Sequence, residues 1–204
     1  MNNIDKIYRT SKDLAEFTQG YLRYLERIFT RFDPTCMNAL GEEFEDARAK
    51  GNAIFVIGNG GSASTATSMG NDLGFDILRK TGTDVPFRVL PLTDNNASVT
   101  AIANDVGYEE VFLDQLRIHF RPGDRLLLIS ASGNSPNILK AARWVRSQGG
   151  RIIGFVGFAG GEAKALCDVF VHVETLPGEY GPVEDFHLII NHILSHWFQN
   201  KLRA

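Results

Sequence analysis

The chain has 204 residues, of which 44% are hydrophobic and 22% charged, and its formal net charge is −3 at pH 7. These values are typical of one globular domain, and without a run of Lys or Arg they offer no surface for nucleic acid or an anionic membrane. No apolar run approaches the roughly 20 residues of a membrane-spanning helix, and the polar N-terminus does not resemble a signal peptide. Cys36 and Cys167 form no metal-type cluster, so we expect a cytoplasmic protein.

The first 50 residues are predicted to be helical. Apolar residues recur three or four positions apart between Leu14 and Phe32, which predicts a long amphipathic helix. Asp33 and Pro34 predict the cap and the first residue of a second helix, which ends at Gly51. Because no strand precedes the long helix, we expect it to lie outside the sheet unit, against the domain or a partner subunit.

Five apolar runs alternate with helical patterns in the rest of the chain. Strands are predicted at 53–57, 87–92, 125–130, 151–156 and 169–173, and helices at 62–78, 95–104, 109–120, 135–148, 162–166 and 182–201. Continuous apolar strands that alternate with helices predict an α/β fold, a doubly wound five-stranded parallel sheet flanked by helices. We expect residues 1–204 to form a single domain, with 1–50 as an N-terminal helical extension and 51–204 as the α/β core.

Two turns that follow predicted strands stand out. The first is Gly58-Asn59-Gly60-Gly61-Ser62, whose glycines allow a tight bend and a close approach to a ligand. The free N–H groups of the helix that follows favour an anion such as phosphate. The turn lacks the third glycine of G-x-G-x-x-G and the lysine of a P-loop, so we expect no nucleotide cofactor.

The second turn is Ser130-Ala131-Ser132-Gly133-Asn134-Ser135, between a strand and a helix. Three hydroxyls and the N–H groups of a helix start, without Lys or Arg, suit a phosphate monoester. The alternative is that Ser135 only caps its helix and the other serines fill the turn. Because the carboxyl ends of parallel strands meet at one edge of the sheet, both turns can converge on one ligand.

The two turns, together with Asn104-Asp105, resemble the sugar isomerase (SIS) domain family and its phosphoheptose isomerase-like branch. The likeness covers most of the chain, including the N-terminal helices and the last helix. It implies a homotetramer with active sites between subunits, and a phosphorylated sugar rather than a nucleic acid or a membrane as the partner. It implies that the sugar phosphate contacts Ser130, Ala131, Ser132 and Ser135, and that the rest of the sugar contacts Asn59, Gly60, Gly61, Asn104, Asp105 and Glu184.

Conversion of a ketose phosphate to an aldose phosphate needs a base that moves a proton between adjacent carbons through an enediol, and an acid at the oxygen. The resemblance puts Asp72 at the position of the family's catalytic glutamate and His192 at that of its histidine. Asp72 keeps the carboxylate but is one methylene shorter. A histidine ordinarily titrates near neutral pH, as a proton carrier should. We expect Asp72 to be the base, with Glu184 as the alternative.

Many members of the family hold a zinc ion, and the resemblance puts Ser68, Asp72, Glu184 and His192 at the ligand positions. Serine is a poor zinc ligand, so one strong donor is missing. Asp72, Glu184 and His192 leave a two-carboxylate, one-histidine site for zinc or another divalent metal. His187 and His196 also fall on the last helix, where we expect one to face the core and the other solvent.

The resemblance therefore predicts an isomerase of heptose biosynthesis that converts sedoheptulose 7-phosphate to D-glycero-D-manno-heptose 7-phosphate. Ser68 and Asp72 leave a second hypothesis open, a non-catalytic SIS protein that binds a protein partner, as one tetrameric relative binds a replication initiator. A third hypothesis is a sugar-phosphate sensor, although these 204 residues contain no recognisable DNA-binding segment. The retained His192 and carboxylates favour the enzyme.

Overall fold

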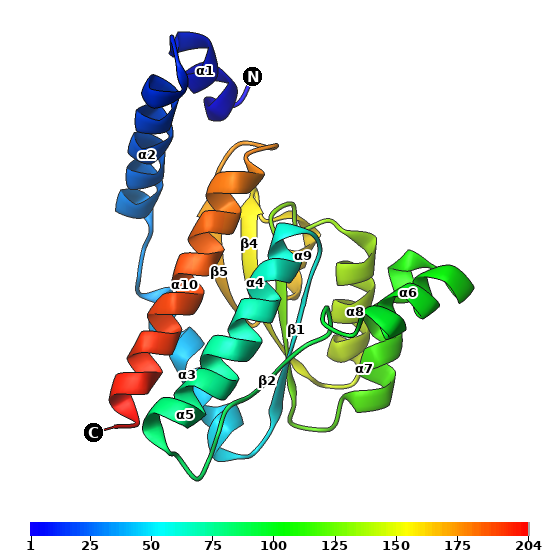
Figure 1. Cartoon of the computed structure of the whole chain (residues 1–204). Coiled ribbons are helices and arrows are strands. Elements are labelled where there is room, and N and C mark those ends of the chain that lie inside the picture. The colour runs from blue at the N-terminus through cyan, green and yellow to red at the C-terminus, as the bar shows by residue number, and fades with distance from the viewer. Residues whose placement is uncertain (204) are drawn as a thin grey trace.

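The computed structural model describes residues 1–203 and is built around one five-stranded sheet with helices on both faces (Figure 1). The strands are β1 (Ala53–Gly58), β2 (Arg88–Pro91), β3 (Arg125–Ser130), β4 (Arg151–Phe158) and β5 (Val169–Glu174). They lie in the order β2-β1-β3-β4-β5 and all pair in parallel. The predicted doubly wound α/β fold is therefore confirmed, and the strand order reverses direction between β1 and β3.

The central strands are buried on both faces, which explains their continuous apolar sequences. Every residue of β1 and β3 is buried. Ile54 and Val56 belong to the core on one face of the sheet, whereas Phe55 and Ile57 belong to the core on the other. This is the alternation that a parallel strand between two layers of helices requires.

The two faces are covered by different sets of helices (Figure 1). On one face lie α3 (Cys36–Ala49), α4 (Gly61–Met69) with its continuation, and α10 (Tyr180–Lys201). On the other face lie α7 (Leu113–His119), α8 (Pro136–Ser147) and α9 (Gly161–Leu166). A short 3-10 helix, η2 (Tyr108–Glu110), precedes α7, and α6 (Asn96–Asp105) stands out from the body. Within residues 1–203, no helix is both long and apolar enough to cross a bilayer.

The predicted long N-terminal helix is α2 (Leu14–Arg31), and it runs beside α10 (Figure 1). Phe29 stacks on Phe186 of α10 with ring centroids 5.0 Å apart. The sequence prediction did not include α1 (Asn3–Thr10), although the capping box formed by Asn2 and Asp5 marks its start.

The predicted start of the second helix needs a correction. Helix α3 begins at Cys36, with Thr35 at the N-cap position. The carboxylate of Asp33 instead accepts hydrogen bonds from the backbone N–H and the hydroxyl of Thr35, at 2.9 and 2.8 Å. Asp33 therefore organises a turn before the helix instead of capping it.

The sequence predicts one helix over 62–78 after the glycine turn, but in the structure this helix is not regular throughout. Helix α4 passes into a π-helical segment, η1 (Gly70–Asp76), and then into α5 (Ile77–Thr81). A Cβ atom on Gly70 would lie 2.6 Å from Cγ of Pro91, so glycine is needed where the end of β2 approaches this helix. π-Helical turns frequently occur at functional sites, and this one contains Asp72.

Candidate active site

The two predicted turns lie side by side at the carboxyl edge of the sheet. They follow β1 and β3, which are neighbours, and Gly58 at the end of β1 is in register with Ile129 of β3. The side chain of Asn59 also exchanges hydrogen bonds with Asn137 in the first turn of α8. The strand order therefore brings both turns to the position where doubly wound sheets bind ligands.

The glycine turn needs its glycines. Gly60 has φ +56° and ψ −124°, a backbone conformation that residues other than glycine rarely adopt. A Cβ atom on Gly61 would lie 2.3 Å from Oε2 of Glu184. The carboxylate of Glu184, from α10, therefore lies directly against the first residue of α4. Its pKa is raised, first by burial and then by the neighbouring charge of Asp185.

The position of Glu184 affects where a phosphate can bind. A carboxylate at the start of α4 already occupies the environment that favours an anion. A second anion there would meet the negative charge of Glu184 and be repelled. The serine turn, which has no acidic residue between 130 and 135, is the better place for the phosphate.

The serine turn keeps its hydroxyl groups available as donors. The hydroxyl oxygen of Ser130 accepts a hydrogen bond from the N–H of Gly133 at 3.0 Å, and that of Ser132 accepts one from Asn134 at 3.3 Å. Each hydroxyl therefore still has its own hydrogen to donate. Ser135 is the N-cap residue of α8, with proline next, but its side chain makes no capping hydrogen bond. Ser135 therefore stands at the cap position without a side-chain capping bond, whereas the hydroxyl oxygens of Ser130 and Ser132 also help to hold the turn together.

Asp72 and His192 lie together on adjoining helices. Oδ2 of Asp72 is 3.7 Å from Nε2 of His192, and their side chains are 21% and 54% exposed. The same Oδ2 accepts a hydrogen bond from Nδ2 of Asn191 at 2.6 Å, and Oδ1 accepts one from Asn71 at 2.9 Å. A partly buried carboxylate beside an accessible imidazole has the geometry of an acid–base pair.

Two of these contacts were not predicted. Asn71 and Asn191 each precede a predicted catalytic residue in sequence, but neither belongs to a motif. Tyr108 was also missed, and its hydroxyl donates to Oδ1 of Asn59 at 2.9 Å. Only the packing of α10 on η1, and of η2 near the first turn, identifies these side chains as part of the site.

Asn104 and Asp105 lie at the exposed end of α6. Nδ2 of Asn104 donates to Oδ1 of Asp105 at 2.7 Å, and no further side-chain hydrogen bond links this pair to the other predicted site residues within the described chain. Helix α6 stands out from the body, on the other side of the sheet from α4 and α10 (Figure 1).

The predicted metal ligands do not gather within one chain. Asp72 is beside His192, but Glu184 lies two helical turns before His192, against Gly61. Over residues 1–203, no three His, Cys, Asp or Glu side chains are grouped as metal ligands would be. Ser68, at the fourth predicted ligand position, adds no strong donor. This donor set does not fit a zinc ion.

The two other histidines of α10 behave as expected. His187 is fully buried, with its ring 5.7 Å from that of Phe155, and His196 is exposed. Burial lowers the pKa of His187 to about 4. The nearby backbone of Val156 acts in the opposite direction and raises the pKa. Its geometry is outside that of a hydrogen bond, and neither ring nitrogen of His187 has a hydrogen-bond partner among residues 1–203.

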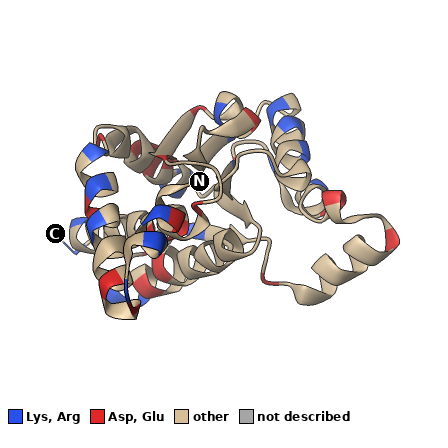
Figure 2. Ribbon diagram, turned by 90° about the horizontal axis from the view of Figure 1, so that it is seen from above, with Lys and Arg blue, Asp and Glu red and all other residues tan. Residues whose placement is uncertain are grey.

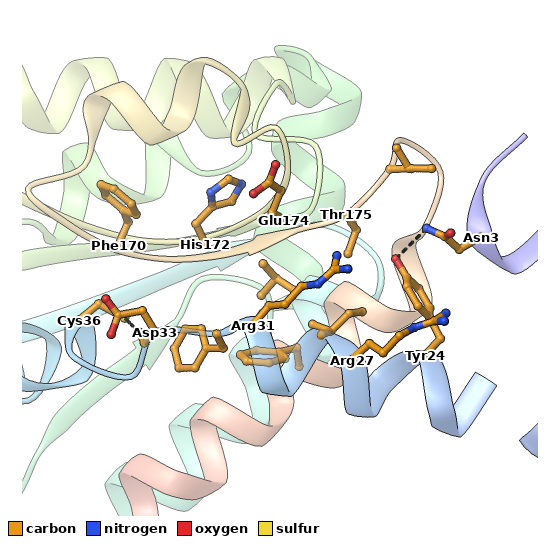
Figure 3. Close-up of a pocket in the computed structure, with 15 residues that line it drawn as sticks. Asn3, Tyr24, Arg27, Arg31, Asp33, Cys36, Phe170, His172, Glu174 and Thr175 are labelled. Carbon is orange, nitrogen blue, oxygen red and sulfur yellow. Dashed lines mark hydrogen bonds between the residues drawn. The ribbon is translucent and has the colours of Figure 1, made fainter. Parts of the chain in front are cut away.

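A cavity of the molecule lies away from these residues (Figure 3). It has a volume of about 780 Å³, lies between α2 and β5, and receives the side chains of Arg27, Arg31 and Thr175. None of the predicted site residues lines it. Its position therefore does not bear on the chemistry of Asp72 and His192.

The SIS domain family matches residues 16–157 of the chain. The phosphoheptose isomerase of Rhodospirillum rubrum is 35% identical over 170 residues, which cover 83% of this chain and 87% of that protein. The phosphoheptose isomerase of Pelobacter propionicus is 32% identical over 184 residues, covering 89% and 94%. The structure of phosphoheptose isomerase GmhA from Neisseria gonorrhoeae matches with a TM-score of 0.80 and 25% identity, over 92% of this chain and 100% of that one.

Proposed function

The chain belongs to the SIS domain family, in its phosphoheptose isomerase branch, and we propose that it converts sedoheptulose 7-phosphate to D-glycero-D-manno-heptose 7-phosphate. The observation that carries the proposal is the 3.7 Å approach of Oδ2 of Asp72 to Nε2 of His192. A carboxylate and an imidazole are the two groups that an enediol mechanism needs.

The serine turn would hold the phosphate of the sugar. Ser130, Ser132 and Ser135 offer hydroxyl donors. Helix α8 begins beside them, and although Pro136 has no N–H and the N–H of Ile138 donates to Oδ1 of Asn137, the positive end of the helix dipole favours an anion there. Neutral donors hold a phosphate monoester without an additional cation. The glycine turn, with Asn59 fixed by Asn137 and Tyr108, would line the sugar.

Asp72 and His192 would share the proton transfers. Asp72 would remove a proton from C1 of the ketose and return it to C2 of the enediol. His192 would donate a proton to the oxygen on C2 and accept the proton from the oxygen on C1, so that protons balance over the reaction. Each oxygen of Asp72 accepts one amide hydrogen bond and keeps a second lone pair for this exchange.

We also infer that the protein is a homotetramer with sites shared between subunits, as the resemblance to the family implies. Helix α6 has no buried residue, and its sequence over 96–105 contains one acidic and no basic residue. Figure 2 shows this helix projecting from the body with little charge along it. Ile189, Ile193 and Trp197 form an exposed apolar stripe beside His192 on α10. A neighbouring subunit would cover both surfaces and could receive Asn104 and Asp105 in its site. Light scattering of the purified protein tests this, and a monomer would contradict it.

We propose a cytoplasmic location, since the phosphorylated substrate is a metabolite of that compartment. Cys36 and Cys167 are both free thiols, as a reducing environment favours.

The activity test is incubation of the purified protein with sedoheptulose 7-phosphate while formation of the aldose is followed. His192→Ala provides the inactive control. Lack of turnover, with or without added divalent metals, would reject the isomerase. If a pull-down then returned a stoichiometric protein partner, the altered Ser68 and Asp72 would instead mark a non-catalytic binding protein.

A further inference from the structure

Four buried polar residues follow one another along α10 at intervals of four: His187, Asn191, Ser195 and Gln199. This spacing places them on one face of the helix, which we call the polar stripe. Each is at most 6% exposed. Buried positions of a helix are ordinarily apolar, and buried polar groups need hydrogen-bond partners. The contacts of the polar stripe should therefore explain why these four buried positions are polar.

Three members of the polar stripe converge on Asp72. Asn191 donates from Nδ2 to the carboxylate of Asp72 at 2.6 Å. Ser195 donates from its hydroxyl to the backbone carbonyl of the same residue at 3.2 Å. Gln199 donates from Nε2 to Oγ of Ser195 at 2.9 Å, which leaves the hydroxyl hydrogen of Ser195 directed to Asp72. Side chain and backbone of one residue are thus both held from α10.

Asp72 lies in η1, where the helix is π-helical. A π-helical turn is wider than an α-helical turn and its backbone hydrogen bonds are less regular. The bond from Ser195 gives the carbonyl of Asp72 an additional fixed donor. Because aspartate is one methylene shorter than the glutamate that the family resemblance places here, the position of the backbone decides how far its carboxylate reaches.

We propose that the polar stripe is a positioning device for Asp72: Asn191 fixes the carboxylate and Ser195, supported by Gln199, fixes the π-helical backbone that presents it. The inference rests on the proposed function, since it takes Asp72 as the base of the isomerase. Asn191 is a positioning residue, because it acts through Asp72 and its own side chain is fully buried.

The test is Asn191→Leu, which keeps the approximate volume and removes the amide donor. In the full-length enzyme we expect kcat to fall about 10-fold while KM changes less than about two-fold, because the substrate contacts remain and only the base is misplaced. Asn200→Leu is the matched control, since Asn200 is an exposed asparagine of the same helix that bonds to the carbonyl of His196.

A double-mutant cycle separates positioning from a general loss of structure. A glutamate at position 72 extends its carboxylate past the hydrogen bond that Asn191 now donates. In an Asp72→Glu background, Asn191→Leu should therefore lower kcat by less than about two-fold. Equal losses in both backgrounds, or a rise of KM with kcat unchanged, would overturn the proposal.

Hydrogen exchange gives a measurement that does not depend on activity. Ser195→Ala removes the donor to Asp72, and we expect amide exchange over residues 70–77 to accelerate about 10-fold or more while β3 is unchanged. An inactive wild-type protein would reject the proposed function. The exchange measurement would still test whether the polar stripe holds the backbone of Asp72. Unchanged exchange over residues 70–77 in Ser195→Ala would overturn the proposed role of the polar stripe. Ser195→Ala also provides the test if Asn191→Leu does not fold.

Discussion

Asn59 and Asn137, 78 residues apart in sequence, exchange two hydrogen bonds: Nδ2 of each donates to Oδ1 of the other, at 3.0 and 2.9 Å. Asn59 belongs to the glycine turn after β1, and Asn137 follows the serine turn by two residues. This reciprocal pair fixes the distance between the two turns that would hold the sugar and its phosphate. Tyr108 adds a third hydrogen bond to Oδ1 of Asn59, at 2.9 Å.

Asn137→Leu should therefore affect both stability and substrate binding. It removes both bonds of the pair and leaves the amide of Asn59 partly unpaired, which we expect to cost about 1–3 kcal/mol of unfolding free energy. KM should rise more than kcat falls, because the two turns lose their fixed separation. Urea denaturation and steady-state kinetics measure the two effects. Asn38→Leu, at an exposed asparagine of α3, is the control, and an unchanged KM for Asn137→Leu would disprove the role.

Ser132→Ala should weaken binding of the sugar phosphate. If its half-buried hydroxyl donates to the phosphate, its loss costs about 1–3 kcal/mol, or about 5- to 150-fold in Kd. Isothermal titration with the substrate or with a phosphorylated sugar alcohol measures the change. Ser147→Ala, at the far end of α8, should leave Kd unaltered because its hydroxyl donates only to the carbonyl of Trp144. Equal affinities for the two variants would remove Ser132 from the phosphate site.

His192→Ala should abolish turnover and leave sugar-phosphate binding within a few-fold of the wild type. The imidazole lies 3.7 Å from Asp72, where it can carry a proton, while the proposed phosphate contacts are in the serine turn. Paired measurements of kcat and Kd test this separation. His196→Ala, one turn further along the exposed side of α10, should retain activity. Full activity of His192→Ala would exclude His192 as the acid.

His187 should make the protein less stable in acid. Its pKa is about 4 in the native state because burial disfavours the charged ring, whereas in the unfolded chain it is near 6.5. Between these values the unfolded chain binds a proton that the native chain excludes, so stability falls as the pH falls from 6.5 to about 4. The difference between the two pKa values corresponds to about 3 kcal/mol.

His187→Leu removes this contribution while keeping an apolar side chain in the core. Urea denaturation at pH 7.5 and at pH 4.5 should show a smaller acid destabilisation for the variant than for the wild type. His196→Ala, at an exposed histidine of the same helix, should follow the wild type. The same pH dependence in His187→Leu and wild type would contradict the assignment.

The wild-type chain should not retain zinc tightly. Asp72 and His192 are adjacent, but Glu184 lies against Gly61 and Ser68 supplies no nitrogen donor. After exposure to zinc and desalting, we expect well under one equivalent per chain by elemental analysis, and more in Ser68→His, which adds a nitrogen donor on the same helix. One equivalent of zinc per chain in the wild type would contradict this prediction, because the ligands would then have to come together in an arrangement that the single chain does not have.

Much of the fold follows from local patterns in the sequence. The apolar runs of β1 and β3 are continuous because these strands are covered on both faces, so their sequences alone indicate a central parallel sheet. The glycine and serine turns are recognisable because their chemistry is local. The π-helical turn at Gly70–Asp76 was not predicted, because it depends on how α4 meets α10 and Pro91.

The same division holds for the site. The sequence by itself identified the two turns, because their residues are contiguous, and through its resemblance to the SIS family it predicted Asp72 and His192 as the acid–base pair. Only the tertiary structure decided that Glu184 lies against Gly61, that Asn191 and Ser195 bond to Asp72, and that α6 stands out from the body, away from α4 and α10. Contacts between helices far apart in the chain depend on crossing geometry and side-chain direction, and no local pattern encodes them.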